Sequence, residues 1–205
     1  MKIGINSGMS NLFQKLELEA FRKGITPRTE ESMAWFRRRA YRIRRVNRNE
    51  IMKDEPINLK SGIAGGGMFM YFYDPKTKDK LPYYDQFPLS IIVDKAPGGF
   101  YGLNLHYLNP ILRAKLLDAL LETINNKKYD ETTKFRLNYK LLKNASKFKH
   151  FQPCFKHYLL DHVRSKFGHV PAPEWEIATF LPTAQWEKST AGAIYSDSRK
   201  TANAG

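Results

Sequence analysis

Three residues in the C-terminal part of the chain have side chains that metal sites and nucleophilic catalysis use. Cys154, His157 and Asp161 are spaced by three and four residues, and would share one face of a helix predicted over 153–166. Cys154 is the only cysteine, which excludes an internal disulfide and a Cys-x-x-Cys zinc pair. A Cys–His catalytic pair also needs an orienting third group. We therefore predict a packed thiol and a paired imidazole, with no catalytic residue, metal or cofactor.

A second candidate site is acidic. Asp74, Asp79 and Asp85 lie near the lysines of the segment 76–80, and carboxylates with a lysine could serve a metal-dependent nuclease. However, Asp74 precedes Pro75 as turn formers do, and Asp79 stands among lysines on an expected exposed tip. A nuclease therefore remains the weakest of three functional interpretations, and we predict that the chain is not an enzyme.

Basic charge is the strongest global feature. The 205 residues carry a formal net charge of +14. Residues 1–56 hold 13 Lys and Arg against 7 Asp and Glu, and residues 133–169 hold 9 against 1. The stretch between these two segments is nearly neutral. Such a distribution attracts polyanions, acidic protein surfaces or anionic lipid. No apolar run reaches the ~18 residues of a membrane span, so we expect no membrane partner.

Arginine dominates the first basic segment. Thr26 and Pro27 predict the start of a helix that continues to about Asn49 and carries most of these arginines. Arginine suits planar, bidentate contact with phosphate or carboxylate better than lysine does. We predict that anionic DNA or an acidic partner is contacted by side chains of both basic segments: Arg37, Arg38, Arg42, Arg44, Arg45, Arg48, Lys140, Lys143, Lys147 and Lys149.

The elements that must position these residues form an α+β fold. Strand-forming runs at 68–73, 89–94 and 100–105 alternate with Pro and Gly breaks. They predict a small SH3-like β barrel or meander at about 66–108. We expect packed helices on both sides and extended terminal arms. Helices are predicted at 9–23, 110–124, 132–145, 153–166 and 174–181, with a last one within 183–200.

We expect the chain to be organised as one core domain with an arm at each end. Residues 1–56 would form an Arg-rich helical arm, 57–170 the core domain, and 171–205 a C-terminal helix and tail arm. The tyrosines and phenylalanines of the core domain could stack nucleic-acid bases, but small β folds need the same residues for their cores. We favour core packing for most of them.

Several segments resemble a known family. They are MFMYFYDPKTKDKLPYYDQFPL, GGFYGLNLHYL, NPILRAKLLDAL, KHFQPCFKHYLLDHVRSKF, PEWEIATFLPTAQW and YSDSRK. Over about 68–200 the chain is similar to virion and DNA-packaging-associated proteins of T4-like and other contractile-tailed bacteriophages. The resemblance implies a place in a phage particle or its assembly. It supplies no catalytic residues.

We therefore predict a non-catalytic structural component of a tailed-phage virion, in the tail, baseplate or head–tail junction. It would be made in the host cytoplasm and would dock through its basic helices in a hetero-oligomeric assembly with other virion proteins. The alternative is a DNA-binding protein that protects or docks the end of the packaged genome, with genomic DNA as its partner.

Overall fold

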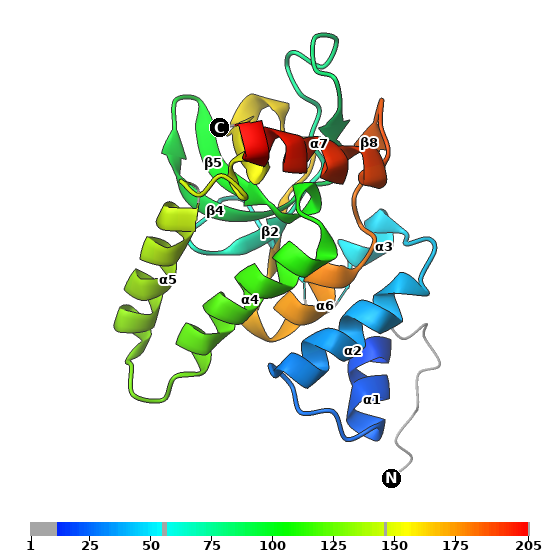
Figure 1. The fold of residues 1–205 in the computed structure, drawn as a ribbon, viewed down its shortest axis with the longest axis vertical. Helices are drawn as coiled ribbons and strands as arrows, with labels where there is room; N and C mark the ends of the chain where they lie inside the picture. Colours follow the sequence, from blue (N-terminus) through cyan, green and yellow to red (C-terminus); the bar gives the residue numbers. More distant parts are fainter. Residues whose placement is uncertain (1–11, 55–56, 146, 205) are drawn as a thin grey trace.

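An open, antiparallel six-stranded sheet forms the centre of the computed structural model, which describes residues 12–54, 57–145 and 147–204 (Figure 1). Its strand order is β1-β7-β2-β4-β5-β6. The bounds are β1 Asn58–Lys60, β2 Met68–Met70, β4 Leu89–Ala96, β5 Gly99–Asn104, β6 Phe155–Leu159 and β7 Phe167–Val170. A separate pair joins β3 Tyr84–Asp85 to β8 Trp186–Glu187.

The sheet corrects the expected barrel. The predicted unit at about 66–108 supplies β2, β4 and β5, but β1 comes from before it and β6 and β7 from after it. The edge strands β1 and β6 do not pair with each other, so the sheet does not close. The Pro and Gly break between the runs 89–94 and 100–105 forms the tight connection between β4 and β5, where Gly98 takes a left-handed φ of 68°.

Helices cover one face of the sheet. They are α1 Leu12–Arg22, α2 Glu30–Tyr41, α3 Arg48–Ile51, α4 Pro110–Asn125, α5 Glu131–Ala145, α6 Trp175–Phe180 and α7 Ala191–Ala204. Helix α6 contacts both α2 and α4, while α5 packs beside α4 (Figure 1). None of these helices meets the size and hydropathy expected of a membrane span, within the described part of the chain.

Successive side chains of a strand point to opposite faces of the sheet, and this alternation produces two hydrophobic cores. Met68 and Met70 point into the main core with the helices, whereas Phe69 and Tyr71 point to the opposite face. There they join a smaller, largely aromatic cluster that also includes Phe100. Strand and loop residues build this second cluster, and no described α-helical residue belongs to it. The expectation of packed helices on both sides is therefore not confirmed by the described residues.

The termini are also packed rather than extended where the structure describes them. Phe13 and Leu16 of α1 and Ile194 of α7 are buried in the main core. Helix α7 contacts the segment 105–107, and α1 packs on α2. The first predicted helical residues, 9–11, lie outside the described range.

Two of the predicted helices differ from what the structure shows. The helix expected over 153–166 is replaced by β6 and two short 3-10 turns. Two of its apolar residues, Phe155 and Leu159, have the four-residue spacing of one helical face, but this even spacing also places both side chains on one face of a strand. The arginine-rich helix ends at Tyr41, eight residues earlier than expected. Stacked like charges at i and i+4, such as Arg38 and Arg42, disfavour its continuation.

Candidate nucleic-acid interface

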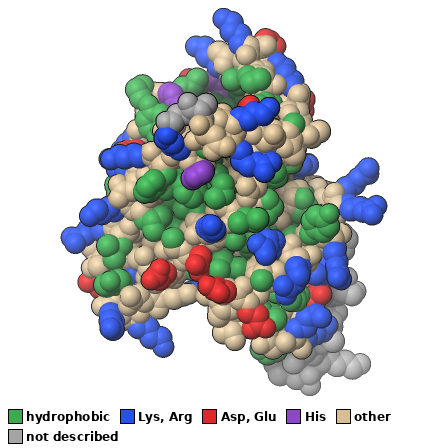
Figure 2. All heavy atoms as spheres, in the orientation of Figure 1, with side chains coloured by type: hydrophobic (Ala, Val, Ile, Leu, Met, Phe, Trp, Pro, Cys, Tyr) green, Lys and Arg blue, Asp and Glu red, His purple; other side chains and the backbone are tan. Residues whose placement is uncertain are grey.

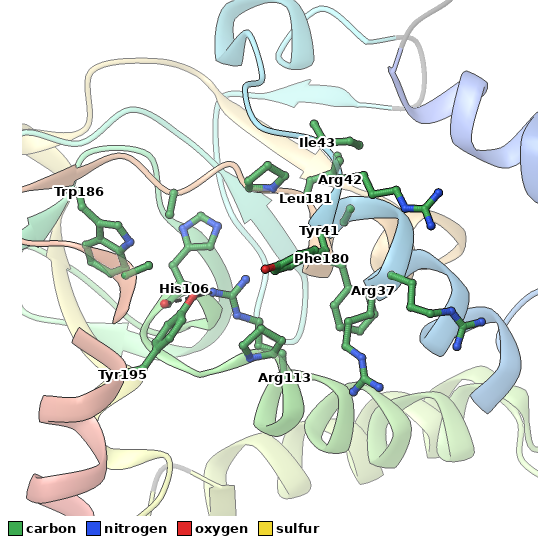
Figure 3. Close-up of a pocket in the computed structure, with 16 residues that line it drawn as sticks. Arg37, Tyr41, Arg42, Ile43, His106, Arg113, Phe180, Leu181, Trp186 and Tyr195 are labelled. Atoms are coloured by element: carbon green, nitrogen blue, oxygen red, sulfur yellow. Dashed lines mark hydrogen bonds between the residues drawn. The ribbon is translucent and has the colours of Figure 1, made fainter. Parts of the chain in front are cut away.

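A basic pocket of about 750 Å³ lies where the end of α2, the start of α4, the segment after α6 and the start of α7 meet (Figure 3). Four arginines and one histidine belong to its lining, and none of the 16 described residues that line it is acidic. Most of the remaining lining is apolar. Its volume lies within the usual range of pockets that hold small molecules.

Helix α2 brings three of the predicted arginines to this pocket. Thr29 and Ser32 start the helix with a capping box, and the buried Phe36 and Ala40 turn its apolar face into the core. Arg37 and Arg38 consequently face outward, and Arg42 follows directly after the helix. All three are exposed, and Arg37 and Arg42 extend away from the α2 backbone in Figure 3.

Arg113 on α4 is the fourth arginine, and it is 6% exposed. Its guanidinium donates to the backbone carbonyls of Leu108, Thr179 and His106 at 2.8–3.2 Å and to the Tyr195 hydroxyl at 2.7 Å. These acceptors are all uncharged, and burial lowers the pKa of the Arg113 guanidinium. The pocket wall therefore contains a positive charge, and no carboxylate of the described chain is hydrogen-bonded to it.

Behind the pocket lies a buried polar chain of Asp85, His106 and Thr183. Asp85 Oδ2 is 2.6 Å from His106 Nδ1, and His106 Nε2 is 3.0 Å from Thr183 Oγ1. Burial lowers the pKa of His106 despite the opposing charge of Asp85. A neutral imidazole would donate to Asp85 and accept from Thr183.

Asp85 organises this wall of the pocket. Burial raises its pKa, but His106 and the N–H groups of Gln185 and Asn104 outweigh burial, so the pKa is lowered overall. Its carboxylate also accepts from the Phe87 backbone at 3.0 Å. These bonds connect β3, the segment 104–106 and the segment after α6. The series Asp85–His106–Thr183 has the acid–histidine–hydroxyl order of a catalytic triad. However, all three side chains are buried away from solvent, which favours a structural role.

Trp186 and Tyr195 complete the pocket. The indole of Trp186 stands edge-on to Tyr107, with ring centroids 4.9 Å apart and planes at 88°. Its buried Nε1 has no hydrogen-bond acceptor among the described residues. Tyr195 on α7 accepts the bond from Arg113, so this helix and α4 are linked across the pocket.

The other predicted arginines lie elsewhere. Arg44 and Arg45 are exposed in the connection after α2 and do not line the pocket. Arg48 turns inward: its Nε donates to the Thr183 carbonyl at 2.8 Å and its Nη2 to the Ala184 carbonyl at 2.5 Å. It therefore supports the pocket from behind. The neighbouring Arg39 instead pairs with Glu19 at 2.8 Å.

The predicted lysines form a second area. Lys140 and Lys147 line a groove between α4 and α5, Lys143 pairs with Asp94 at 3.3 Å, and Lys149 is exposed. Helix α4 separates this area from α2 (Figure 1). Figure 2 shows basic side chains over the α2 region on one side and over the α5 region on the other. The structure therefore does not merge the two predicted sets.

The residues considered for chemistry do not converge. Cys154 Sγ donates to the Phe151 carbonyl at 2.8 Å, and burial raises its pKa to about 12. His157 lies on β6 within 3.0 Å of the Pro97 carbonyl, not on a shared helical face with Cys154. Asp74 pairs with Lys78, whereas the buried Asp85 contacts a different set of residues that includes His106. In the ranges that the structure describes, no group of three or more His, Cys, Asp or Glu side chains could hold a metal ion.

Sequence reasoning missed His106, Arg113, Trp186 and Tyr195. Arg113 left a readable signal, because it falls on the same helical stripe as Leu116, Leu117 and Leu120, which are buried. An arginine on a buried stripe must find several acceptors. The other three residues come together only through long-range packing, so nothing in their local sequence indicates the pocket.

Comparisons with known proteins identify the family. Residues 11–203 match the family model described as phage T4 terminal DNA protecting protein. Searches of curated proteins and of solved structures found no match. The model spans nearly the whole chain and agrees with the resemblance to T4-like phage proteins drawn from the sequence. The chain therefore belongs to the phage T4 terminal DNA protecting protein family.

Proposed function

We propose that this protein binds the ends of linear phage DNA and shields them, without catalysis of its own. The family description supports DNA ends as the target. The single structural observation that carries the proposal is the basic pocket, which combines four arginines with no acidic residue in its described lining. The family does not support the tail or baseplate role that we placed first from the sequence; it favours the DNA-protecting alternative.

The exposed arginines supply the attraction to DNA. Arg37, Arg38 and Arg42 line the α2 side of the pocket, are exposed, and can each contact a backbone phosphate. Guanidinium groups bind phosphate oxygens in a bidentate manner without reading bases, which suits a protein that must accept ends of any sequence. In this proposal genomic DNA is the partner and the phage particle is the place of action.

An exonuclease assay tests the proposal. A linear duplex is incubated with the protein and then with an enzyme that degrades DNA only from ends. We expect the half-life of the linear DNA to increase strongly at low salt. The logarithm of the DNA-binding constant should fall linearly with the logarithm of the salt concentration.

A circular duplex treated with a non-specific endonuclease is the matched control. Protection of the linear DNA alone indicates end shielding. Equal protection of both substrates would indicate general coating and would contradict the proposal, as would failure to protect either.

The absence of catalysis needs its own test. Linear and circular DNA are incubated with the protein and Mg²⁺ or Mn²⁺, with Asp74→Asn and Asp85→Asn variants beside the wild type. We expect intact DNA in every lane. Cleavage by the wild type that Asp85→Asn abolishes would replace the proposal with the nuclease interpretation.

A further inference from the structure

We infer, building on the proposed function, that the basic pocket receives the phosphate monoester at the end of a DNA strand. The exposed arginines at the opening would hold the following backbone phosphates. End recognition would then reside in the pocket, and general DNA affinity in the surface around it.

The shape of the pocket supports this division. It is bordered by α2, α4, α7 and the segment after α6, and its volume of about 750 Å³ exceeds what a lone phosphate needs (Figure 3). Pockets of roughly 300–1,000 Å³ accommodate small molecules the size of a nucleotide. An internal phosphate of a duplex is flanked by sugars on both sides and cannot be inserted without them. A strand terminus has only one such neighbour.

The charge of the pocket also favours a terminal phosphate. A monoester carries about −1.5 to −2 charges near neutral pH, whereas an internal diester carries about −1. Arg113 is 6% exposed and donates to three carbonyls and one hydroxyl, so none of these hydrogen-bond partners carries a negative charge, although the buried Asp85 carboxylate attracts the guanidinium from a distance. In a partly desolvated site, charge-assisted contacts are stronger than on an open surface.

Two neutral donors can add directional contacts. Trp186 Nε1 is buried without an acceptor in the described chain, and the edge-on contact with Tyr107 fixes its ring. Tyr195 accepts from Arg113 at 2.7 Å, which leaves its own hydroxyl hydrogen to donate. An oxygen-rich anion would satisfy both groups, and an apolar ligand would satisfy neither.

A set of short duplexes tests the inference. One duplex carries only hydroxyl ends, a second has 5′-phosphates, a third has 3′-phosphates, and a dumbbell closed by hairpin loops has no ends. We expect one phosphorylated duplex to bind wild type about tenfold more tightly than the hydroxyl duplex. The duplex that gains affinity identifies the strand end that is bound. Equal affinity for all three linear duplexes would overturn the inference.

Variants locate the effect. Trp186→Phe and Tyr195→Phe each remove one donor and keep an aromatic ring, so the preference for the phosphorylated end should fall severalfold while dumbbell affinity is unchanged. Tyr129→Phe removes a hydroxyl on the groove between α4 and α5 and should change neither quantity. A full preference in both pocket variants would overturn the inference.

Competition keeps the test decisive if a variant fails to fold. A deoxynucleoside monophosphate should displace the phosphorylated duplex from wild-type protein much better than the corresponding nucleoside, and equal potency would count against the inference. The proposed function fails differently: wild type would then bind no duplex at low salt and would give no exonuclease protection. Protection without any phosphate preference would leave the proposed function standing and remove only the pocket assignment.

Discussion

Arg48 and Arg44 belong to the same arginine-rich stretch, but their guanidinium groups have different surroundings. Arg48 donates to two carbonyls of the segment after α6, whereas Arg44 is exposed. We expect Arg48→Ala to reduce the free energy of unfolding by about 1–3 kcal/mol, because two acceptors lose a charged donor. Arg44→Ala should change it by less than about 0.5 kcal/mol. Urea titrations measure both, and equal stability of the two variants would show that the inward contacts of Arg48 are unimportant.

His106 gives the fold a dependence on pH. Its pKa is lowered mainly by burial, so the folded protein binds this proton more weakly than the unfolded chain does. The stabilising contribution is therefore present above the unfolded pKa of about 6.5 and is lost as the pH falls below it. We expect this residue to remove about 1–2 kcal/mol of stability between pH 7.5 and 5.5.

The variant His106→Asn isolates this contribution. Asparagine can still donate toward Asp85 but cannot take up a proton, so the variant should be less stable at pH 7.5 and should lose less stability on acidification. Urea unfolding at several pH values provides the comparison. A variant whose stability falls as steeply as that of the wild type would assign the acid sensitivity to other groups.

At the scale of elements, local patterns predicted what local forces determine. Helix α4 begins at the predicted Pro110 because Asn109 caps it, and its apolar stripe is long enough to identify. Strand β6 was mistaken for a helix because its partner, β5, lies about fifty residues earlier and is invisible in the local pattern. The same limit applies to the site: Arg37, Arg38 and Arg42 stand out by composition, whereas Trp186 and Tyr195 reach them only through the tertiary fold.

The pairing of β5 with β6 depends on one glycine. A Cβ on Gly99 would lie 1.8 Å from the Tyr158 carbonyl oxygen, a distance that the backbone must relieve by moving. We expect Gly99→Ala to cost about 3 kcal/mol or more and to separate the ends of these strands.

Gly192 is the matched control for that substitution. It lies on α7, and a Cβ there meets no atom within 4 Å. Gly192→Ala should therefore be neutral or stabilise the protein by up to about 1 kcal/mol. Thermal unfolding compares the two variants, and a Gly99→Ala protein as stable as Gly192→Ala would mean that the strands tolerate a wider spacing.

The whole molecule presents two basic areas of different construction. Around α2 the arginines border a pocket with no acidic residue in its described lining, and along α5 the lysines border a groove that includes Glu122 or pair with acids. Charge alone predicts that the two areas bind DNA equally well. The geometry predicts otherwise, because among the described residues only the α2 area combines several guanidinium groups that have no acidic partner with the pocket that we propose accepts a strand end.

Two triple variants distinguish these possibilities at equal loss of charge. Arg37→Ala/Arg38→Ala/Arg42→Ala and Lys140→Ala/Lys147→Ala/Lys149→Ala each remove three positive charges from exposed positions. We expect the arginine variant to lose most exonuclease protection and to bind linear DNA with a salt slope smaller by up to about 2.7, if each arginine contacts one phosphate. The lysine variant should protect DNA ends nearly as well as wild type. Equal losses in the two variants would mean that net charge, and not the pocket on α2, determines how this protein holds a DNA end.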